Sequence, residues 1–370
     1  MKKILFFINT LNGGGAEKVL VDLVNNLNPH EYEIDLVTVS SGVYQKKIKP
    51  NVNYRNMIKT DSKILKKFFT KLFYHLPVKL VNKLIKNGDY DIEIAYLEGF
   101  PTKVIAAGNS KAKKVTFVHC DVSKQNVLGK FYRSPVECVA EYERFDKVCF
   151  VSTAAMSGFE KSVKSLNNSA VIHNVIDFDN VKRLSKSTSN REYSTRGIKL
   201  ISIGRLSEEK GNERLVEVIS ELENDYNLEL WIIGDGPRRP AIENLIEKKN
   251  IKAVKLLGYQ SNPYAFMSKA DLLVCPSFYE GYSTVAAEAI SLGLPVMTTD
   301  CAGMDEILDK GTCGLIVDNS MLGIKNGLLT VIKDKEYYNG IKLAAEKKSQ
   351  NFTNDFAVKE YDDLFRELLE

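Results

Sequence analysis

The chain has 370 residues, of which 44% are apolar and 26% charged, and its formal net charge is +4. This composition excludes an intrinsically disordered chain, and the length exceeds the roughly 250 residues at which a single hydrophobic core usually stops growing. The nearly balanced charge does not favour a nucleic-acid partner. We therefore expect two folded domains that bind no nucleic acid.

Short apolar runs rich in Val and Ile alternate with helical patterns through the first half of the chain. This alternation predicts βα units around a parallel sheet. The first run follows Lys2 and Lys3 but is interrupted by Asn9 and Asn12, and no small-residue cleavage site follows, so it indicates a strand and not a signal peptide. The predicted strands of this half are 4–8, 34–39, 92–97, 115–118 and 148–151.

Three glycines, Gly13 to Gly15, join the first predicted strand to a helix that should begin near Ala16. Glycines at such a turn let the backbone approach a ligand, and the N–H groups of a helix start favour an anion or a polar oxygen. A dinucleotide site would read GxGxxG with an acid after the second strand, where Ser40 and Ser41 stand instead. A ligand-binding turn and a plain tight turn both stay open here.

Residues 62–86 do not fit a simple βα unit. Apolar residues recur there at helical spacing, with Phe68-Phe69 and Phe73-Tyr74 widening the stripe, and seven lysines but no acid accompany them. Pro77 suits the first turn of a second helix. A basic amphipathic helix of this kind can lie in the headgroup region of an anionic membrane. The alternative is that the stripe packs on its own domain and the lysines are merely solvated.

The polar residues 179–196 lack periodicity and predict a linker between the domains. Beyond them the apolar runs return and predict a second sheet, after which residues 356–369 show a helical stripe that could dock on the first domain. The predicted strands of the second half are 200–203, 228–233, 254–257, 272–274, 295–298 and 315–317. No apolar run reaches the length of a membrane span.

Two cations, Arg205 and Lys210, lie on the predicted loop after the first strand of the second domain. Cations there can converge on a diphosphate, Arg205 through its planar fork and Lys210 as a point charge. That charge would stabilise a leaving nucleotide diphosphate. A surface ion pair is the alternative for Lys210.

Two glutamates, Glu280 and Glu288, lie near the carboxyl end of a predicted strand and in the helix that follows. Ligands of doubly wound α/β folds bind at this edge of the sheet, and carboxylates accept hydrogen bonds from paired sugar hydroxyls. The alternatives are a residue beside a helix N-cap for Glu280 and an exposed helix residue for Glu288.

Together these motifs resemble glycosyltransferase family 4. The resemblance spans nearly the whole chain and rests on four segments: Gly14-Gly15-Ala16-Glu17, Gly204-Arg205-Leu206 with Lys210-Gly211, Gly234-Asp235-Gly236-Pro237, and Glu280-x7-Glu288 between Pro276-Ser277 and Gly293-Leu294-Pro295-Val296. It implies the GT-B fold, two Rossmann-like domains facing each other across a cleft, and a retaining sugar transfer from a nucleotide diphosphate sugar, a UDP-sugar, without metal or cofactor. The acceptor it implies is a saccharide, lipid-linked if residues 62–86 contact a membrane, as in surface polysaccharide assembly.

The resemblance also implies site residues. Arg205 and Lys210 would bind the diphosphate, Glu280 the sugar hydroxyls and Glu288 the ribose. His119, directly after the strand 115–118, matches the histidine of the first domain that contacts the donor sugar. We expect catalysis to depend on His119, Arg205, Lys210 and Glu280, and donor binding to add Gly14, Gly15, Tyr259, Ser283, Thr284 and Glu288.

The predicted domains are 1–178 for the acceptor, including the insertion 62–86, then the linker 179–196, the nucleotide domain 197–350 and the terminal helix 351–370. The six cysteines form no CxxC pair, so neither a zinc site nor a disulfide framework is indicated, and we expect a cytoplasmic protein, peripheral at the inner membrane face. A sugar-nucleotide epimerase and a non-catalytic partner subunit of a glycosyltransferase stay open as alternatives.

Overall fold

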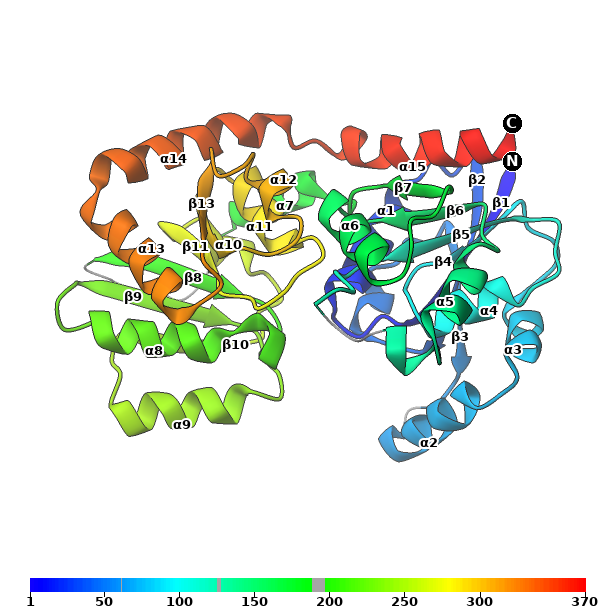
Figure 1. Ribbon diagram of the computed structural model, residues 1–370, viewed down its shortest axis with the longest axis horizontal. Helices are drawn as coiled ribbons and strands as arrows, with labels where there is room; N and C mark the ends of the chain where they lie inside the picture. Colours follow the sequence, from blue (N-terminus) through cyan, green and yellow to red (C-terminus); the bar gives the residue numbers. More distant parts are fainter. Residues whose placement is uncertain (61, 125–127, 188–196) are drawn as a thin grey trace. The chain divides into compact units, whose positions relative to one another are not determined.

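The computed structural model describes residues 1–60, 62–124, 128–187 and 197–370, with residues 63 and 355–357 as backbone only. It divides into two compact units, one formed by Met1–Ile176 with Asn354–Glu370 and one by Asp177–Thr353. Each unit is an α/β structure around its own parallel sheet (Figure 1). The prediction of two Rossmann-like sheets is confirmed.

The first unit contains seven parallel strands in the order β3-β2-β1-β4-β5-β6-β7. Its central strands are almost wholly apolar because helices cover both faces of the sheet. The strands are β1 (Lys2–Thr10), β2 (Tyr32–Ser40), β3 (Val52–Ile58), β4 (Ile92–Ala95), β5 (Lys113–Val118), β6 (Lys147–Phe150) and β7 (Ser169–Val171). The helices are α1 (Gly15–Asn26), α2 (Lys63–Tyr74), α3 (Val78–Ile85), α4 (Phe100–Ala106), α5 (Pro135–Tyr142), α6 (Thr153–Ser162) and α15 (Asn354–Leu369).

The last helix, α15, belongs to the first unit although residues 177–353 separate it in sequence from the rest of that unit. Its apolar stripe lies in the core of this unit, where the Tyr361 hydroxyl is 3.1 Å from that of Tyr96 and the Tyr361 ring stacks on Phe117. At its polar edge, Glu360 accepts a hydrogen bond from the His173 backbone N–H (2.8 Å). The predicted return of the C-terminal helix to the first domain is confirmed.

The second unit contains six parallel strands in the order β10-β9-β8-β11-β12-β13, and all six match predicted strands within two residues. The strands are β8 (Ile198–Ile203), β9 (Leu228–Ile233), β10 (Val254–Gly258), β11 (Leu272–Cys275), β12 (Val296–Thr299) and β13 (Gly314–Val317). The helices are α7 (Phe178–Ser185), α8 (Asn212–Leu222), α9 (Arg239–Lys249), α10 (Tyr264–Met267), α11 (Thr284–Ser291), α12 (Met304–Ile307), α13 (Met321–Lys333) and α14 (Lys335–Lys348).

The first part of the predicted linker 179–196 is instead helical. Helix α7 spans Phe178–Ser185, and the Asp177 side chain caps it by accepting a hydrogen bond from the Asn180 N–H (3.0 Å). Phe178 and Val181 are buried, so this helix packs as part of the second unit. The short apolar pattern of α7 was too sparse to predict a helix. Residues 188–196 of the predicted linker lie outside the described residues.

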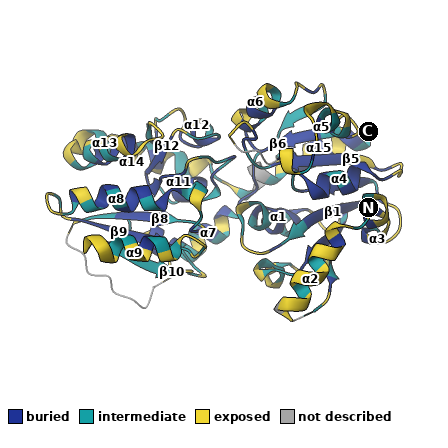
Figure 2. Ribbon diagram, turned by 60° about the horizontal axis from the view of Figure 1, so that its bottom comes forward, coloured by how far each residue is buried: buried dark blue, intermediate teal, exposed yellow. Residues whose placement is uncertain are grey.

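Residues 62–86 form two helices that differ in how they pack. Helix α3 buries Val81 and Ile85, and Arg55 donates a hydrogen bond to the Ile85 carbonyl. Helix α2 buries only Phe73 among its apolar residues and leaves the rest exposed, as the yellow and teal surface of α2 in Figure 2 shows. Among the described residues, no helix combines the length and the apolar character needed to cross a membrane.

Candidate donor-binding site

The loop between β8 and α8 carries both predicted cations. After β8 the backbone passes Arg205, forms a single 3-10 turn at Glu208–Lys210, and reaches Gly211 with φ 62° and ψ 20°. A Cβ at Gly211 would lie 2.1 Å from the Pro276 carbonyl oxygen. A glycine is therefore needed here both for the left-handed backbone and for the close approach of this loop to the loop after β11.

The loop after β11 is fixed by a buried arginine that the sequence did not single out. Arg214 on α8 is 7% exposed and donates to the Pro276 carbonyl from Nε (2.9 Å) and Nη2 (2.7 Å), and to the Ser277 carbonyl (2.8 Å). Its guanidinium also lies 3.9 Å from the centre of the Phe278 ring. These contacts hold the segment that leads into Glu280. The sequence offered no signal for Arg214 beyond its place on an amphipathic helix.

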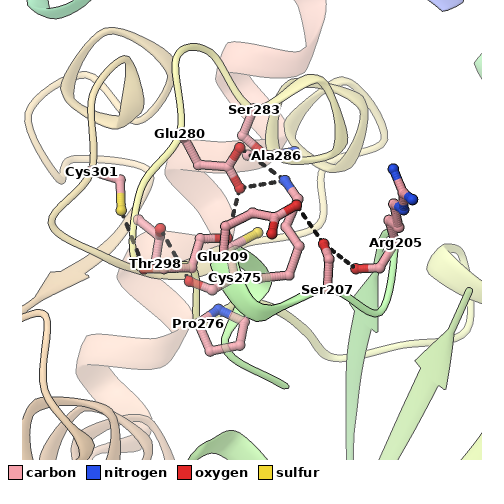
Figure 3. A network of polar contacts seen from close by, with 12 residues as sticks. Arg205, Ser207, Glu209, Cys275, Pro276, Glu280, Ser283, Ala286, Thr298 and Cys301 are labelled. Carbon is pink, nitrogen blue, oxygen red and sulfur yellow. Dashed lines mark hydrogen bonds and ion pairs between the residues drawn. The ribbon is translucent and has the colours of Figure 1, made fainter. Parts of the chain in front are cut away.

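Lys210 and Glu280 form an ion pair between these two loops. The Lys210 Nζ donates to both carboxylate oxygens of Glu280 (2.7 and 2.9 Å), and the Ser277 hydroxyl donates to Oε1 (2.6 Å). Burial lowers the pKa of Lys210, but the charge and the hydrogen bonds of Glu280 outweigh burial and raise that pKa above its ordinary value. Lys210 is therefore a cation with a defined position. Figure 3 shows this network around Glu280 and Ser283.

Glu288 is a buried residue, 4% exposed, in the second turn of α11. Its Oε1 accepts a hydrogen bond from the Tyr264 hydroxyl (3.1 Å). The interpretation of Glu288 as an exposed helix residue is thus wrong. Because a buried carboxylate is costly unless hydrogen bonded, its retention within an apolar stretch favours a specific role.

The remaining predicted residues of the second unit lie around the same strand ends. Ser283 is buried and caps α11 by accepting from the Ala286 N–H (3.3 Å), so its hydroxyl has a structural partner, and Thr284 begins that helix. Arg205 is exposed, and in Figure 3 its side chain points away from the Glu280 carboxylate. Tyr259, directly after β10, is 65% exposed. The structure thus brings Lys210 and Glu280 into contact but leaves Arg205 and Tyr259 exposed to solvent.

The predicted residues of the first unit lie at the carboxyl ends of its strands. Gly14 and Gly15 stand at the start of α1, and His119 follows β5. The His119 N–H donates to Glu98 Oε2 (3.0 Å), and the Cys120 thiol donates to Glu98 Oε1 (3.2 Å). Sequence reasoning missed Glu98, although its place after the predicted strand 92–97 could have indicated it.

The His119 imidazole is neutral at physiological pH. Burial is the main reason that its pKa falls from 6.5 to about 3, and a hydrogen bond with the Tyr96 backbone opposes this shift. Nε2 is buried and has no hydrogen-bond partner among the described residues. A neutral ring can exchange hydrogen bonds with a ligand but cannot supply a positive charge.

The depressed pKa of His119 predicts an acid-dependent loss of stability. Between about pH 6.5 and about pH 3 the His119 imidazole is protonated in the unfolded chain but stays neutral in the folded chain. The free energy of unfolding should therefore fall as pH falls, by at most about 1.4 kcal/mol per pH unit. His119→Gln should remove this part of the pH dependence. Urea unfolding at pH 7 and pH 5 tests it, with the exposed His30→Gln as a control. The prediction is contradicted if the free energy of unfolding falls between pH 7 and pH 5 by the same amount in His119→Gln as in the wild type.

The second unit matches a known family. Residues 181–348 fit the family model described as glycosyl transferases group 1. This match lies within the second unit, Asp177–Thr353. The whole chain is also 25% identical over 366 residues to an N-acetylgalactosaminyltransferase of Campylobacter jejuni, whose name gives a diphospho-undecaprenol-linked saccharide as its acceptor, with coverage of 95% of this chain and 96% of that protein.

Solved structures of glycosyltransferases share the fold over the full length. HepE of Anabaena, crystallised with UDP and glucose, has a TM-score of 0.76 at 18% identity and covers 99% of this chain and 100% of its own. Sucrose-phosphate synthase of Thermosynechococcus elongatus has a TM-score of 0.78 at 16% identity, covering 100% of this chain and 99% of its own. The predicted GT-B fold class, with two parallel Rossmann-like sheets, is confirmed.

Proposed function

We propose that this protein acts as a glycosyltransferase of group 1, and specifically as a retaining, metal-independent enzyme of family 4 that transfers a sugar from a UDP-sugar to a saccharide acceptor. The observation that carries the proposal is the contact of Lys210 with Glu280, since two loops 70 residues apart in sequence converge there on one cation and one carboxylate. The buried Glu288 on the adjoining helix supplies a second carboxylate.

Each residue has a distinct role in the proposal. Lys210 and Arg205 bind the diphosphate and stabilise the negative charge that develops on it as it leaves. Glu280 accepts hydrogen bonds from the donor-sugar hydroxyls and Glu288 from the ribose. In the structure the Glu280 carboxylate binds the Lys210 ammonium group and fixes its position. An incoming diphosphate would bind to the same ammonium group alongside Glu280. This pairing orients Lys210 before the donor arrives, and the exposed Arg205 can move to the phosphates.

The chemical step we propose is attack from the side of the leaving group. The acceptor oxygen forms a bond to the anomeric carbon, the bond from that carbon to the phosphate oxygen breaks, and the departing phosphate takes the acceptor's proton. The configuration at the anomeric carbon is thereby retained. The contribution of the protein is electrostatic and positional, and no metal takes part in this scheme. Gly14 and Gly15 are proposed to contact the donor or acceptor, and His119 to contact the donor sugar.

The acceptor we propose is a lipid-linked saccharide used in surface polysaccharide assembly. Two observations support it: the relative from Campylobacter jejuni is named for such an acceptor, and α2 exposes apolar side chains beside lysines. Ile64 and Phe68 are 82% and 60% exposed. The proposed location is therefore the cytoplasmic face of the inner membrane, with α2 lying at the lipid surface.

Not every lysine of the insertion can serve a lipid surface. Lys66 donates to the Ser41 carbonyl (2.6 Å) and hydroxyl (2.8 Å), and Lys86 pairs with Glu93 (2.7 Å). Lys67, Lys71, Lys79 and Lys83 are exposed and stay as the candidates.

Reversing the charge of Lys67 and Lys71 is therefore expected to weaken binding to anionic liposomes. At about 1 kcal/mol for each lysine near the surface, Lys67→Glu with Lys71→Glu should lower the partition coefficient by roughly 30-fold or more, and the wild-type binding should weaken in high salt. Sedimentation with phosphatidylglycerol vesicles measures it. The matched control changes two exposed lysines of α14, Lys342 and Lys347, to Glu. Equal binding by both variants would contradict the membrane proposal.

The proposed activity is tested by a panel of nucleotide diphosphate sugars. A UDP-sugar should protect the protein against thermal unfolding, because a ligand that binds only the folded state stabilises it. With a saccharide acceptor, NMR of the product should show the anomeric configuration of the donor, and EDTA should leave the rate unchanged. The proposal fails if no nucleotide sugar protects the protein, or if the donor is converted to an epimer without acceptor.

A further inference from the structure

An apolar pocket lies between helix α2 and the end of strand β3. It has a volume of about 350 Å³ and is lined by Met57, Ile58, Lys59, Thr60, Phe69, Leu72, Phe73 and Leu76. Ile58 and Phe73 are buried and form its base, whereas Phe69 and Leu72 stay 43% and 51% exposed along the helix. Two large apolar side chains are thus held open to solvent beside a preformed hollow, which is costly unless something covers them.

The pocket is located at the edge of the sheet where α/β folds bind their ligands. Ile58 is the last residue of β3, and Lys66 ties α2 to Ser41, the residue directly after β2. All seven strands of this sheet are parallel, so their carboxyl ends share one edge, at which His119 also lies. The hollow is therefore built into the ligand-binding edge of the first unit and not into a remote surface.

The charge around the pocket selects the kind of occupant. Lys59 is exposed among the lining residues, Lys66 and Lys67 lie on the helix above, and none of the described lining residues is acidic. An apolar hollow with a basic rim is complementary to an amphiphile that has a hydrocarbon tail and an anionic head. A second copy of this surface would place lysines against lysines and is disfavoured by that repulsion.

We propose that this pocket binds the hydrocarbon chain of a phosphorylated lipid acceptor, with the exposed Lys59 next to its phosphates. The inference rests on the proposed function, since it gives a place on the protein to the lipid of the lipid-linked acceptor. It goes beyond adsorption to a membrane, because the hydrocarbon chain of the lipid leaves the bilayer and enters a defined site on the protein. The reactive saccharide of the acceptor is thereby held at the carboxyl edge of the sheet.

The test separates two residues of the same helix. Leu72 lines the pocket, whereas Ile64 is more exposed and does not line it. The full-length protein is titrated with a fluorescent farnesyl diphosphate in buffer without membrane or detergent, and binding is followed by anisotropy. Leu72→Gln is expected to raise Kd by about tenfold, since it removes an apolar contact of a kcal/mol or more, and Ile64→Gln to leave Kd within about twofold. Because both side chains are at least half exposed, thermal unfolding should confirm that both variants fold.

Three outcomes would overturn the proposal. The first is that the probe does not bind, and the second is that Leu72→Gln and Ile64→Gln lose affinity equally, which indicates adsorption along the helix. The third is that inorganic diphosphate displaces the probe completely at the same concentration as farnesyl diphosphate, which indicates that the hydrocarbon tail contributes nothing to binding. Geranyl diphosphate should bind more weakly than the farnesyl compound. This assay needs no sugar donor, so its failure is distinct from failure of the proposed function, which the protection by nucleotide sugars reports.

Discussion

Replacing Lys210 by alanine is expected to lower kcat by about 10²- to 10³-fold with the cognate donor. The substitution removes the positive charge proposed to stabilise the leaving diphosphate, and it also leaves the Glu280 carboxylate, 11% exposed, without its counter-ion. Arg205→Ala is expected in the same range, because Arg205 is the second cation assigned to the phosphates. Initial rates of sugar transfer at saturating donor measure both.

The matched control for Lys210 is Lys255→Ala. Lys255 pairs with Glu229 in the same unit, and that carboxylate is 12% exposed, close to the value for Glu280. If Lys255→Ala keeps a kcat close to wild type while Lys210→Ala loses most of it, the loss is due to the location of Lys210 at the candidate site and not to the breaking of an ion pair as such. A loss of less than threefold in either Lys210→Ala or Arg205→Ala would rule out the role assigned to that residue.

Phe365→Ala is expected to destabilise the first unit by about 3 to 5 kcal/mol. Phe365 is fully buried on α15, and its ring contacts those of Phe6 (centroids 6.4 Å apart) and Tyr32 (5.7 Å). Truncation leaves a cavity between this helix and the sheet, because the closely packed neighbouring side chains cannot move in to replace the lost ring contacts. The midpoint of urea unfolding by circular dichroism should fall accordingly.

The single tryptophan makes this prediction specific to one unit. Trp231 is buried on β9 of the second unit, so its fluorescence reports the unfolding of that unit alone. The circular dichroism transition should shift in Phe365→Ala more than the fluorescence transition. Leu343→Ala, at an exposed position of α14, should change neither. A shift of both transitions by the same amount would contradict the assignment of α15 to the first unit.

Strand prediction succeeded where burial leaves a sequence signal. All six strands of the second sheet were predicted, because parallel strands covered on both faces read as runs of Val, Ile and Leu. The two strands missed, β3 and β7, are the edges of the first sheet. β3 carries Asn53, Arg55 and Asn56, and β7 has only three residues, so neither shows an apolar run. These two edge strands are identified only by their pairing with a neighbouring strand, whereas the edge strands β10 and β13 of the second sheet kept apolar runs and were predicted.

The candidate site divides in the same way. Local motifs predicted Lys210 and Glu280, since both stand in loops at strand ends where ligands bind. Their direct contact and the contact of Arg214 with the loop after β11 join residues that are far apart along the chain. Ser277 belongs to the Pro276-Ser277 motif, but the motif did not reveal that its hydroxyl donates to Glu280. The fate of residues 62–86 was likewise undecided, because an amphipathic stripe indicates a helix but does not say whether a partner covers it.

The sequence by itself determined the two parallel α/β sheets, the resemblance to sugar-transferring enzymes and the residue types of the candidate site, because hydrophobic periodicity and short loop motifs are local properties. Only the tertiary structure decided that α15 completes the first unit, that Glu288 is buried against Tyr264, and that α2 keeps all its apolar residues except Phe73 exposed beside a pocket. Each of these depends on which surfaces meet after folding, and packing between distant segments leaves no periodic trace in either one.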